Sequence, residues 1–223
     1  MSFKDKISRH LLKRVNPDNH RYLPSYLFDG SENYHLSKEA ASIYPVLCSK
    51  ADFKKNSWFH ISQKRGAELS GINEETFIKG IDDLKSHGIV QQKFVTKKTI
   101  HRYLYKIDFI RQHQLGLPEY KGKYFVFYTS IIEHTVWRNL TSRERVIYLT
   151  GRATSKGEYN TDNDNYRNRE SDYCPLSIRK ICTVGGISDR NLKSLKLLRQ
   201  YGLLTSHGRD YYFHLKPDLS FLM

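Results

Sequence analysis

An internal repeat constrains the fold of this chain more than any other feature of its sequence. The segment Leu36–Tyr44 recurs as Leu140–Tyr148, and both segments begin with Leu followed by Ser or Thr and end with Ile-Tyr. Further recurring pairs are Ile61–Arg65 with Leu176–Lys180, Ser70–Glu74 with Gly185–Asp189, and Leu84–Val90 with Leu198–Leu204. Because a pattern repeated along a chain is typical of a repeated structural unit, we predict two copies of one fold.

The distance between equivalent residues grows from 104 to 115 positions along the chain, so the second copy contains an insertion of 11 residues. The polar run 155–172 is the predicted site of this insertion, because it has almost no apolar residues and is typical of an exposed loop. The predicted organisation is a basic N-terminal helix or arm at 1–21, a first domain at 22–112, a linker at 113–123 and a second domain at 124–223.

Each copy shows the pattern helix, short strand, helix, tight turn, helix and β-hairpin. The expected N-caps are Ser37, Ser62 and Asn73 in the first copy and Thr141, Ser177 and Ser188 in the second. Hairpins are expected at Ile89–Phe109 and Leu203–Leu215, where apolar and polar residues alternate. This order is that of a winged helix-turn-helix. The predicted fold class is therefore α+β, with two tandem winged helix-turn-helix domains and an N-terminal basic helix; a repeat-built α+β protein used for protein contacts is the alternative.

The charge balance indicates a polyanionic partner. Lys and Arg number 37 against 23 Asp and Glu, which gives a formal net charge of +14. Each Lys or Arg placed beside a phosphate releases condensed counterions, although charge alone does not separate DNA, RNA and an anionic membrane surface. No run of about 18 apolar residues and no apolar signal region occur, so neither a membrane-spanning helix nor a secretory signal is expected. Three cysteines without a Cys-x-x-Cys spacing favour the cytoplasm.

The third helix of a helix-turn-helix enters the major groove with its exposed N-terminal side chains. In the second copy these are Arg190, Asn191, Lys193 and Ser194, which we predict to contact bases, because Arg pairs with guanine and Asn with adenine. Predicted contacts to the DNA backbone are Lys93, Lys97, Lys98, Arg102, Lys64, Arg65, Arg179, Lys180, Lys196 and Arg209. A solvated basic face without a ligand is the alternative for the third helix.

The third helix of the first copy differs, since its acidic residues outnumber its basic ones. Its acidic residues are Glu74, Glu75, Asp82 and Asp83, and its basic residues are Lys79 and Lys85. The hairpin that follows carries five basic residues and no acidic one between Ile89 and Lys106. We therefore expect a division of work in which the second copy contacts bases and the first copy binds the DNA backbone with its hairpin or dimerises.

The N-terminal segment is predicted to be a basic amphipathic helix. Phe3, Ile7, Leu11 and Val15 are spaced four residues apart, and Asn16-Pro17 ends the pattern. Such a helix is able to lie on a membrane, to dock a partner subunit or to contact phosphates. With two predicted winged domains behind it, packing or dimerisation with incidental DNA contact is the preferred interpretation.

Residues for catalysis and metal binding do not form a known pattern. There is no His-x-His pair of a DNA-nicking enzyme and no Gly-x-x-x-x-Gly-Lys phosphate loop. Cys174, Cys182, His207 and His214 match no common zinc spacing, so buried thiols are expected. The polar insertion lacks the Gly and the final Glu of a calcium-binding loop. We expect no enzyme activity, no cofactor and no metal site.

The layout of the two copies resembles bacterial plasmid replication initiators and related proteins of mobile elements. The residues that carry the resemblance run from Leu23–Leu27 through Tyr44 and from Gly71-Ile72-Asn73 through Gly88-Ile89-Val90, together with their counterparts in the second half. Taken together they span most of residues 22 to 215. The resemblance implies binding to a replication origin and dimerisation through one of the two winged domains.

The expected function is sequence-specific binding of double-stranded DNA, with initiation of plasmid or mobile-element replication as the leading role. The expected partners are duplex DNA, a second copy of the chain and the replication machinery. A winged-helix transcriptional regulator is the alternative within the same class. A protein-interaction adaptor and an RNA-binding module are the alternatives from other classes.

Overall fold

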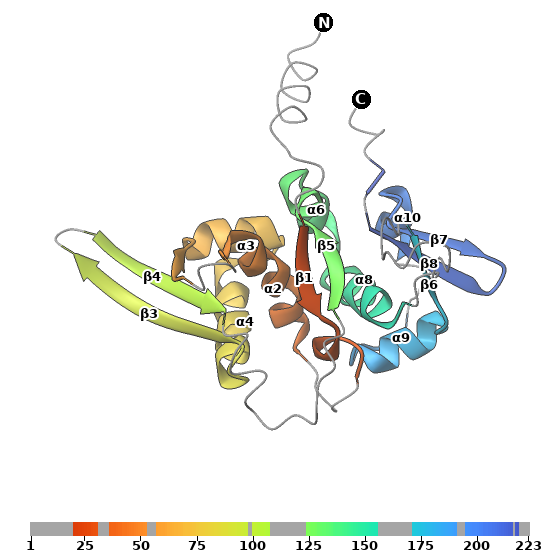
Figure 1. Ribbon diagram of the computed structural model, residues 1–223, viewed down its shortest axis with the longest axis horizontal. Helices are drawn as coiled ribbons and strands as arrows, with labels where there is room; N and C mark the ends of the chain where they lie inside the picture. Colours follow the sequence, from red (N-terminus) through yellow and green to blue (C-terminus); the bar gives the residue numbers. More distant parts are fainter. Residues whose placement is uncertain are drawn as a thin grey trace, which may run out of the picture. The chain divides into compact units, whose positions relative to one another are not determined.

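The computed structural model describes residues 20–30, 36–52, 57–97, 100–107, 124–155, 171–190, 195–215 and 217–218. The described residues form a mixed α+β structure with small antiparallel sheets (Figure 1), as the sequence predicts. The chain divides into two compact units. We call Leu36–Lys123 the first unit, and Met1–His35 together with Tyr124–Met223 the second unit.

The first unit holds three helices and a three-stranded sheet. Its elements are α2 (Lys38–Lys50), β2 (Phe59–His60), α3 (Gln63–Ser70), α4 (Glu74–Ser86), β3 (Val90–Lys97) and β4 (Ile100–Ile107). The strands lie in the order β2–β4–β3. The predicted caps are confirmed, since Ser37, Ser62 and Asn73 each accept a hydrogen bond from the backbone N–H three residues later. Phe77, Ile81 and Leu84 of α4 are buried, as its apolar stripe predicts.

The second unit repeats this order after a two-stranded lead-in. Its elements are β1 (His20–Pro24), η1 (Ser25–Leu27), β5 (Tyr124–Tyr128), α6 (Ser130–Glu133), α7 (Val136–Asn139), α8 (Ser142–Thr154), β6 (Ser171–Cys174), α9 (Ile178–Val184), α10 (Lys196–Gln200), β7 (Leu204–His207) and β8 (Asp210–His214). The three-stranded sheet has the order β6–β8–β7. This order matches β2–β4–β3 of the first unit, strand for strand. The predicted caps Thr141 and Ser177 are also confirmed.

The turns between the helices show the same repeat at the level of single hydrogen bonds. After the second helix of each unit, Gly71 and Gly186 have φ values of 63° and 64°, a conformation that favours glycine because it has no Cβ. The next residue then donates its backbone N–H to the carbonyl five positions back, Ile72 to Ala67 and Ile187 to Cys182. The two units therefore turn from the second helix in the same way.

The strands that precede the first helix of each copy, β1 and β5, pair with each other. The first domain therefore begins after this strand, at Leu36, and not at residue 22 as predicted. β1 runs antiparallel to β5, with His20 opposite Tyr128 and Pro24 opposite Tyr124. The pair is centred on Tyr22 and Val126, which occupy equivalent positions in the repeat. Residues 20–30 thus belong to the second unit rather than to the first. The strand residues 20–24 make their backbone pairing with residues 124–128 of that unit.

Two predicted element limits in the second unit also change. The insertion predicted at 155–172 is shorter at its end, because Ser171 and Asp172 pair with β8 as the start of β6. The third helix, expected from Ser188 onward, appears as α10 from Lys196. The predicted N-terminal helix and the linker 113–123 lie outside the described residues, as do residues 156–170 and 191–194.

Candidate nucleic-acid interface

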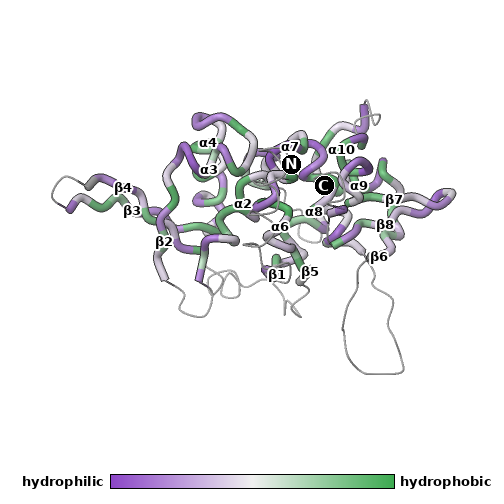
Figure 2. The backbone as a smooth tube through the Cα atoms, turned by 90° about the horizontal axis from the view of Figure 1, so that it is seen from above, coloured by the Kyte–Doolittle hydropathy of each residue, from purple (hydrophilic) through white to green (hydrophobic). Residues whose placement is uncertain are grey.

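The β-hairpin of the first unit reaches beyond the helices of that unit (Figures 1 and 2). β3 and β4 have eight residues each, and they pair along their whole length from Val90 opposite Ile107 to Lys97 opposite Ile100. The base of the hairpin is anchored in the core, where Val90, Tyr105 and Ile107 are buried. In the outer half, residues of both faces are exposed, among them Phe94, Lys97 and Arg102.

One face of the hairpin collects the basic residues. In an antiparallel pair, residues directly opposite each other share a face, as do alternate residues along a strand. The register therefore places four basic residues on one face, which we call the basic face: Lys93, Lys97, Arg102 and Lys106. The first three of these are exposed, and the sequence has no acidic residue between Ile89 and Ile107. A phosphate backbone laid on this face meets positive charge only.

Trp58, which the sequence analysis did not single out, joins the basic face. The Nζ atom of Lys93 lies 4.2 Å from the centre of the Trp58 ring, the geometry of a cation–π contact. Trp58 directly precedes β2, and β2 pairs with β4. The closeness of Trp58 to Lys93 could not be predicted from the sequence, because it depends on the pairing of β2 with β4, segments more than 40 residues apart.

The exposed surface of α4 carries ion pairs rather than a bare acidic patch. Lys79 Nζ lies 2.7 Å from Glu75 Oε1, and Lys85 Nζ lies 3.0 Å from Asp82 Oδ1. The hydrogen bond from Lys79 lowers the pKa of Glu75, and the same bond raises the pKa of Lys79. The acidic residues here are thus partly neutralised by lysines of the same helix.

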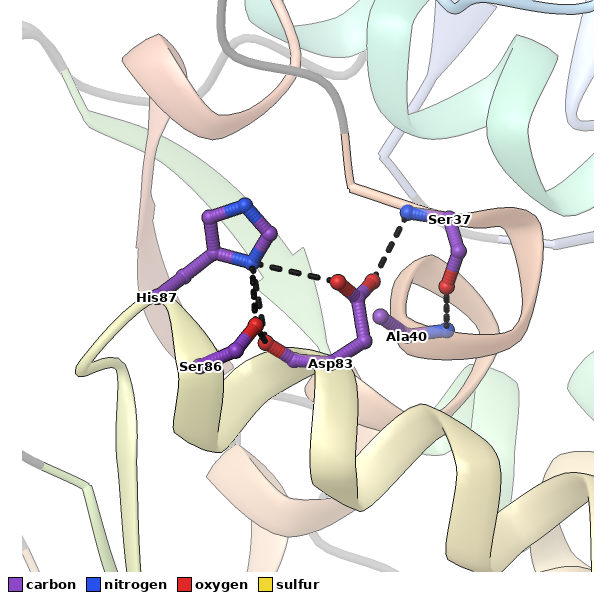
Figure 3. Close-up of polar contacts among 5 residues, drawn as sticks. All are labelled: Ser37, Ala40, Asp83, Ser86 and His87. Atoms are coloured by element: carbon purple, nitrogen blue, oxygen red, sulfur yellow. Dashed lines mark hydrogen bonds and ion pairs between the residues drawn. The ribbon is translucent and has the colours of Figure 1, made fainter.

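Asp83, which the sequence groups with the other acidic residues of this helix, does not lie on its exposed surface. Its Oδ2 accepts a hydrogen bond of 2.9 Å from the backbone N–H of Ser37, and its Oδ1 lies 3.1 Å from Nδ1 of His87 (Figure 3). Ser37 in turn caps α2 by accepting from the N–H of Ala40. Asp83 therefore ties the third helix of the first unit to the start of its first helix.

Glu144 makes the equivalent link in the second unit, but from the opposite helix. Its Oε2 accepts from the N–H and the hydroxyl of Thr141, at 3.0 and 2.9 Å, which completes a capping box on α8. Its Oε1 accepts from the N–H of Leu197 at 3.0 Å, across to α10. Glu144 is only 1% exposed. This one carboxylate fixes the start of α10, whose N-cap Leu195 provides no side-chain cap.

The residues predicted to contact bases are described only in part. Arg190 is exposed, and its backbone N–H donates to the hydroxyl of Ser188 at 3.2 Å, a local bond between residues two positions apart; the helix that Ser188 is expected to cap is described only from Lys196. The guanidinium of Arg143 on α8 donates to the carbonyl of Arg190. Asn191, Lys193 and Ser194 lie outside the described residues, as does Lys98 of the first hairpin.

The predicted backbone contacts on the second helices lie at matching places in the two units. Lys64 and Arg65 on α3 correspond in the repeat to Arg179 and Lys180 on α9, and all four side chains are exposed. Two of them face acidic groups: Arg65 lies 2.7 Å from Glu68, and Arg179 lies 3.9 Å from Asp189. Lys196 at the start of α10 and Arg209 in the turn between β7 and β8 are exposed as well.

The hairpin of the second unit is shorter and less basic than that of the first. β7 has four residues and β8 has five. Asp210 begins β8, and its charge raises the pKa of Tyr173, whose hydroxyl donates to it at 3.4 Å. An acid at the turn weakens the attraction of this hairpin for phosphates.

Cys174 and Cys182 are buried thiols, as predicted, and Cys48 is buried as well. Burial raises the pKa of Cys174 and of Cys182. Within the described ranges, no group of three His, Cys, Asp or Glu residues is close enough to hold a metal ion. The described part of the chain also has no helix of the length and apolarity that crossing a membrane requires.

Comparisons with known proteins add no further information on the site. The chain matches no protein-family model, no curated protein and no solved structure.

Proposed function

We propose that this protein binds double-stranded DNA in a sequence-specific manner through two winged helix-turn-helix domains. The observation that carries the proposal is the basic face of the first hairpin. Lys93, Lys97, Arg102 and Lys106 lie on one side of a hairpin that extends from the end of a three-helix unit and contains no acid. In a winged helix this hairpin is the wing, and basic residues on it neutralise phosphates.

The helix geometry supports the same proposal. In the first unit α3 and α4 are separated by residues 71–73, with Gly71 in the left-handed conformation. A short turn that contains glycine is typical of the helix-turn-helix. Gly186 follows α9 in the same way. With Arg190 shortly after it, the second unit is the better candidate for contacts to bases, since α4 presents ion-paired acids.

The most specific role we propose is initiation of plasmid or mobile-element replication at an origin, with the protein acting as a homodimer. This role rests on the resemblance of the repeated layout to plasmid initiators. Transcriptional regulation is the second candidate, because the same fold serves it. A footprint on DNA flanking its own gene separates the two: protection of direct repeats supports an initiator, and protection of a promoter palindrome supports a regulator.

The test of DNA binding compares two pairs of lysines in the same unit. Lys93→Gln with Lys97→Gln removes two charges from the basic face, whereas Lys79→Gln with Lys85→Gln removes two lysines that are paired with acids on α4. We expect the first variant to weaken binding to a labelled duplex about tenfold and to reduce the salt slope by about 1.8, because each lost phosphate contact reduces it by about 0.9.

The measurement is fluorescence anisotropy over a series of salt concentrations. The control variant should change the slope by less than about half as much. If both variants lose affinity and salt slope equally, only the net charge of the protein matters and the position of the lysines does not. If the unaltered protein fails to bind any duplex at low salt, the proposed function is wrong.

A further inference from the structure

We propose that the other face of the first hairpin binds unpaired bases of single-stranded DNA by stacking. We call Phe94, His101 and Tyr103 the aromatic face. Phe94 lies directly opposite Tyr103, and Thr96 lies opposite His101, so all three rings share one side of the ribbon. The basic face lies on the opposite side of the same two strands. This inference goes beyond duplex binding, which needs only the basic face.

The rings on this face lie close together. The ring centres of Phe94 and Tyr103 are 5.0 Å apart, and those of Phe94 and His101 are 6.2 Å apart with their planes only 13° from parallel. Such spacing gives a continuous aromatic surface that spans both strands of the hairpin. A sheet face that carries neighbouring aromatic rings is a platform on which nucleic-acid bases stack.

These rings are exposed although their strand positions continue the core face. Toward the base of the hairpin the same face carries Val90, Tyr105 and Ile107, which are buried. Farther out, Phe94 is 56% exposed and Tyr103 is 38% exposed. Among the residues that the structure describes, only Ile78 is another large apolar side chain with comparable exposure. A partner that covers the two rings removes apolar surface from water, which favours binding.

The surrounding charge selects a nucleic acid as that partner. The five basic residues of the hairpin and the absence of acids between Ile89 and Ile107 favour a polyanion over a protein of ordinary charge. Lys93 and Lys97 lie on β3, the edge strand of the sheet, so their positive charge lies along the open edge that borders both faces of the hairpin.

The rings further select unpaired bases over a duplex. In a duplex the faces of the bases are already stacked on their neighbours, so a flat ring has no π-surface to contact without paying for unstacking. In a single strand each base presents such a surface, and stacking on aromatic side chains together with a basic groove is how single strands are bound without sequence preference. We assign single-stranded DNA because the proposed function places duplex DNA at the neighbouring face.

The test uses the full chain and two fluorescently labelled probes, an oligo(dT) of about 20 nucleotides and a duplex of the same length. The variant Phe94→Ala with Tyr103→Ala is compared with Ile78→Ala, which removes an exposed apolar side chain from α4 of the same unit. We expect the double variant to weaken oligo(dT) binding about tenfold or more, with duplex binding changed less than about twofold. Ile78→Ala should leave both affinities unchanged.

Conservative variants distinguish stacking from general apolar contact. Phe94→Trp should keep the affinity for oligo(dT), whereas Phe94→Leu should lose it, because leucine has no π-face. Circular dichroism and thermal melting verify that the variants are folded, which the exposure of Phe94 leads us to expect.

Several results would overturn the inference while leaving duplex binding intact. These are no binding of oligo(dT) by the unaltered protein, equal losses from Phe94→Leu and Phe94→Trp, or tighter binding of oligo(U) than of oligo(dT). A change from dimer to monomer in size-exclusion chromatography of the Phe94→Ala, Tyr103→Ala variant would assign the aromatic face to a second copy of the chain instead. Loss of duplex binding by the unaltered protein would reject the proposed function separately.

Discussion

α2 of the first unit and α8 of the second occupy the same place in the repeat but are built from opposite chemistry. Both begin after a capping Ser or Thr, and both bury an Ile-Tyr pair: Ile43 and Tyr44 in α2, and Ile147 and Tyr148 in α8. At three other buried positions α2 has Ala40, Ala41 and Cys48 where α8 has Glu144, Arg145 and Arg152. The first unit is centred on an apolar helix and the second on a charged one.

Each buried charge of α8 binds a backbone group of a neighbouring segment. Arg145 donates to the carbonyls of Trp137 and Arg138 at 2.9 and 3.0 Å, and Arg152 donates to the carbonyl of Phe213 at 2.9 Å. Burial lowers the pKa of Arg145 to about 10, and the nearby charge of Glu144 opposes that change. Groups of this kind define the position of their neighbours more than they add net stability, because desolvation offsets most of their attraction.

The helix-to-helix link shows the same difference at a single bond. In the repeat Ala40 corresponds to Glu144, and Asp83 corresponds to Leu197. The carboxylate thus lies on the third helix in the first unit and on the first helix in the second unit. The contact between the start of the first helix and the third helix is retained, although the acidic group has moved from one helix to the other. The repeat therefore preserves the geometry of the link rather than the residues that make it.

Among the changes that test this comparison, loss of the Glu144 carboxylate should have the largest effect on stability. Glu144→Ala leaves two backbone N–H groups and one hydroxyl without their acceptor, and we expect it to destabilise the second unit by about 3 kcal/mol or more. Asp83→Ala should cost the first unit about 1 to 2 kcal/mol, because Asp83 is 22% exposed and water replaces part of the lost bonding. Native-state hydrogen exchange, followed separately for each unit, measures both values.

Asp189→Ala is the matched control for this pair, since Asp189 is an exposed carboxylate of the second unit whose ion pair with Arg179 is long, at 3.9 Å. It should change stability by less than about 1 kcal/mol. If Asp83→Ala and Glu144→Ala reduce stability equally, burial of the carboxylate does not determine how much its removal costs.

A smaller effect is expected from moving the carboxylate of the second unit to the position that it has in the first. Leu197→Asp places an acid at the site equivalent to Asp83, where it can accept from the N–H of Thr141 but not from its own N–H. We expect Glu144→Ala combined with Leu197→Asp to be more stable than the sum of the single variants by about 1 kcal/mol. Chemical denaturation of all four proteins in the cycle gives the coupling energy. Strict additivity would mean that the two arrangements are not interchangeable.

The smallest effect is expected at the glycine turn after the second helix, where the two units are alike. Gly71→Ala and Gly186→Ala should each destabilise their own unit by about 1 kcal/mol, because both residues have a left-handed conformation that a Cβ disfavours. Asparagine tolerates this conformation better, so Gly71→Asn and Gly186→Asn should cost less than alanine. Hydrogen exchange measured for each unit should give matching values, and a difference larger than about 1 kcal/mol would indicate that the two turns are not equivalent.

Features that depend on neighbours in the sequence could be predicted for this chain. The caps at Ser37, Ser62, Asn73, Thr141 and Ser177, both hairpins and the buried stripe of α4 all follow from residues within a few positions of one another. The predicted burial of Cys174 and Cys182 follows from the small apolar character of cysteine.

Features that depend on distant pairing could not be predicted in this way. The partner of β1 lies about 100 residues away, and apolar residues alone do not specify which strand it meets. Asp83 looks like a surface acid in the helical pattern, because its acceptor role depends on where Ser37 lies. The alternation of β3 and β4 assigns residues to faces, but it does not indicate where the core ends and Phe94 becomes exposed.

The pairing of β1 with β5 has a consequence for the order in which the chain becomes structured during its synthesis. β1 leaves the ribosome first among the described strands, yet its partner β5 follows only after the whole first unit has been made. At about 5 to 20 residues per second, β1 waits roughly 5 to 20 seconds for that partner. During that time the first unit, which is compact by itself, is able to fold, while β1 remains an unpaired strand edge. β1 is therefore the first of the described strands to be made, yet it is paired only after both strands of the first unit's hairpin have been made.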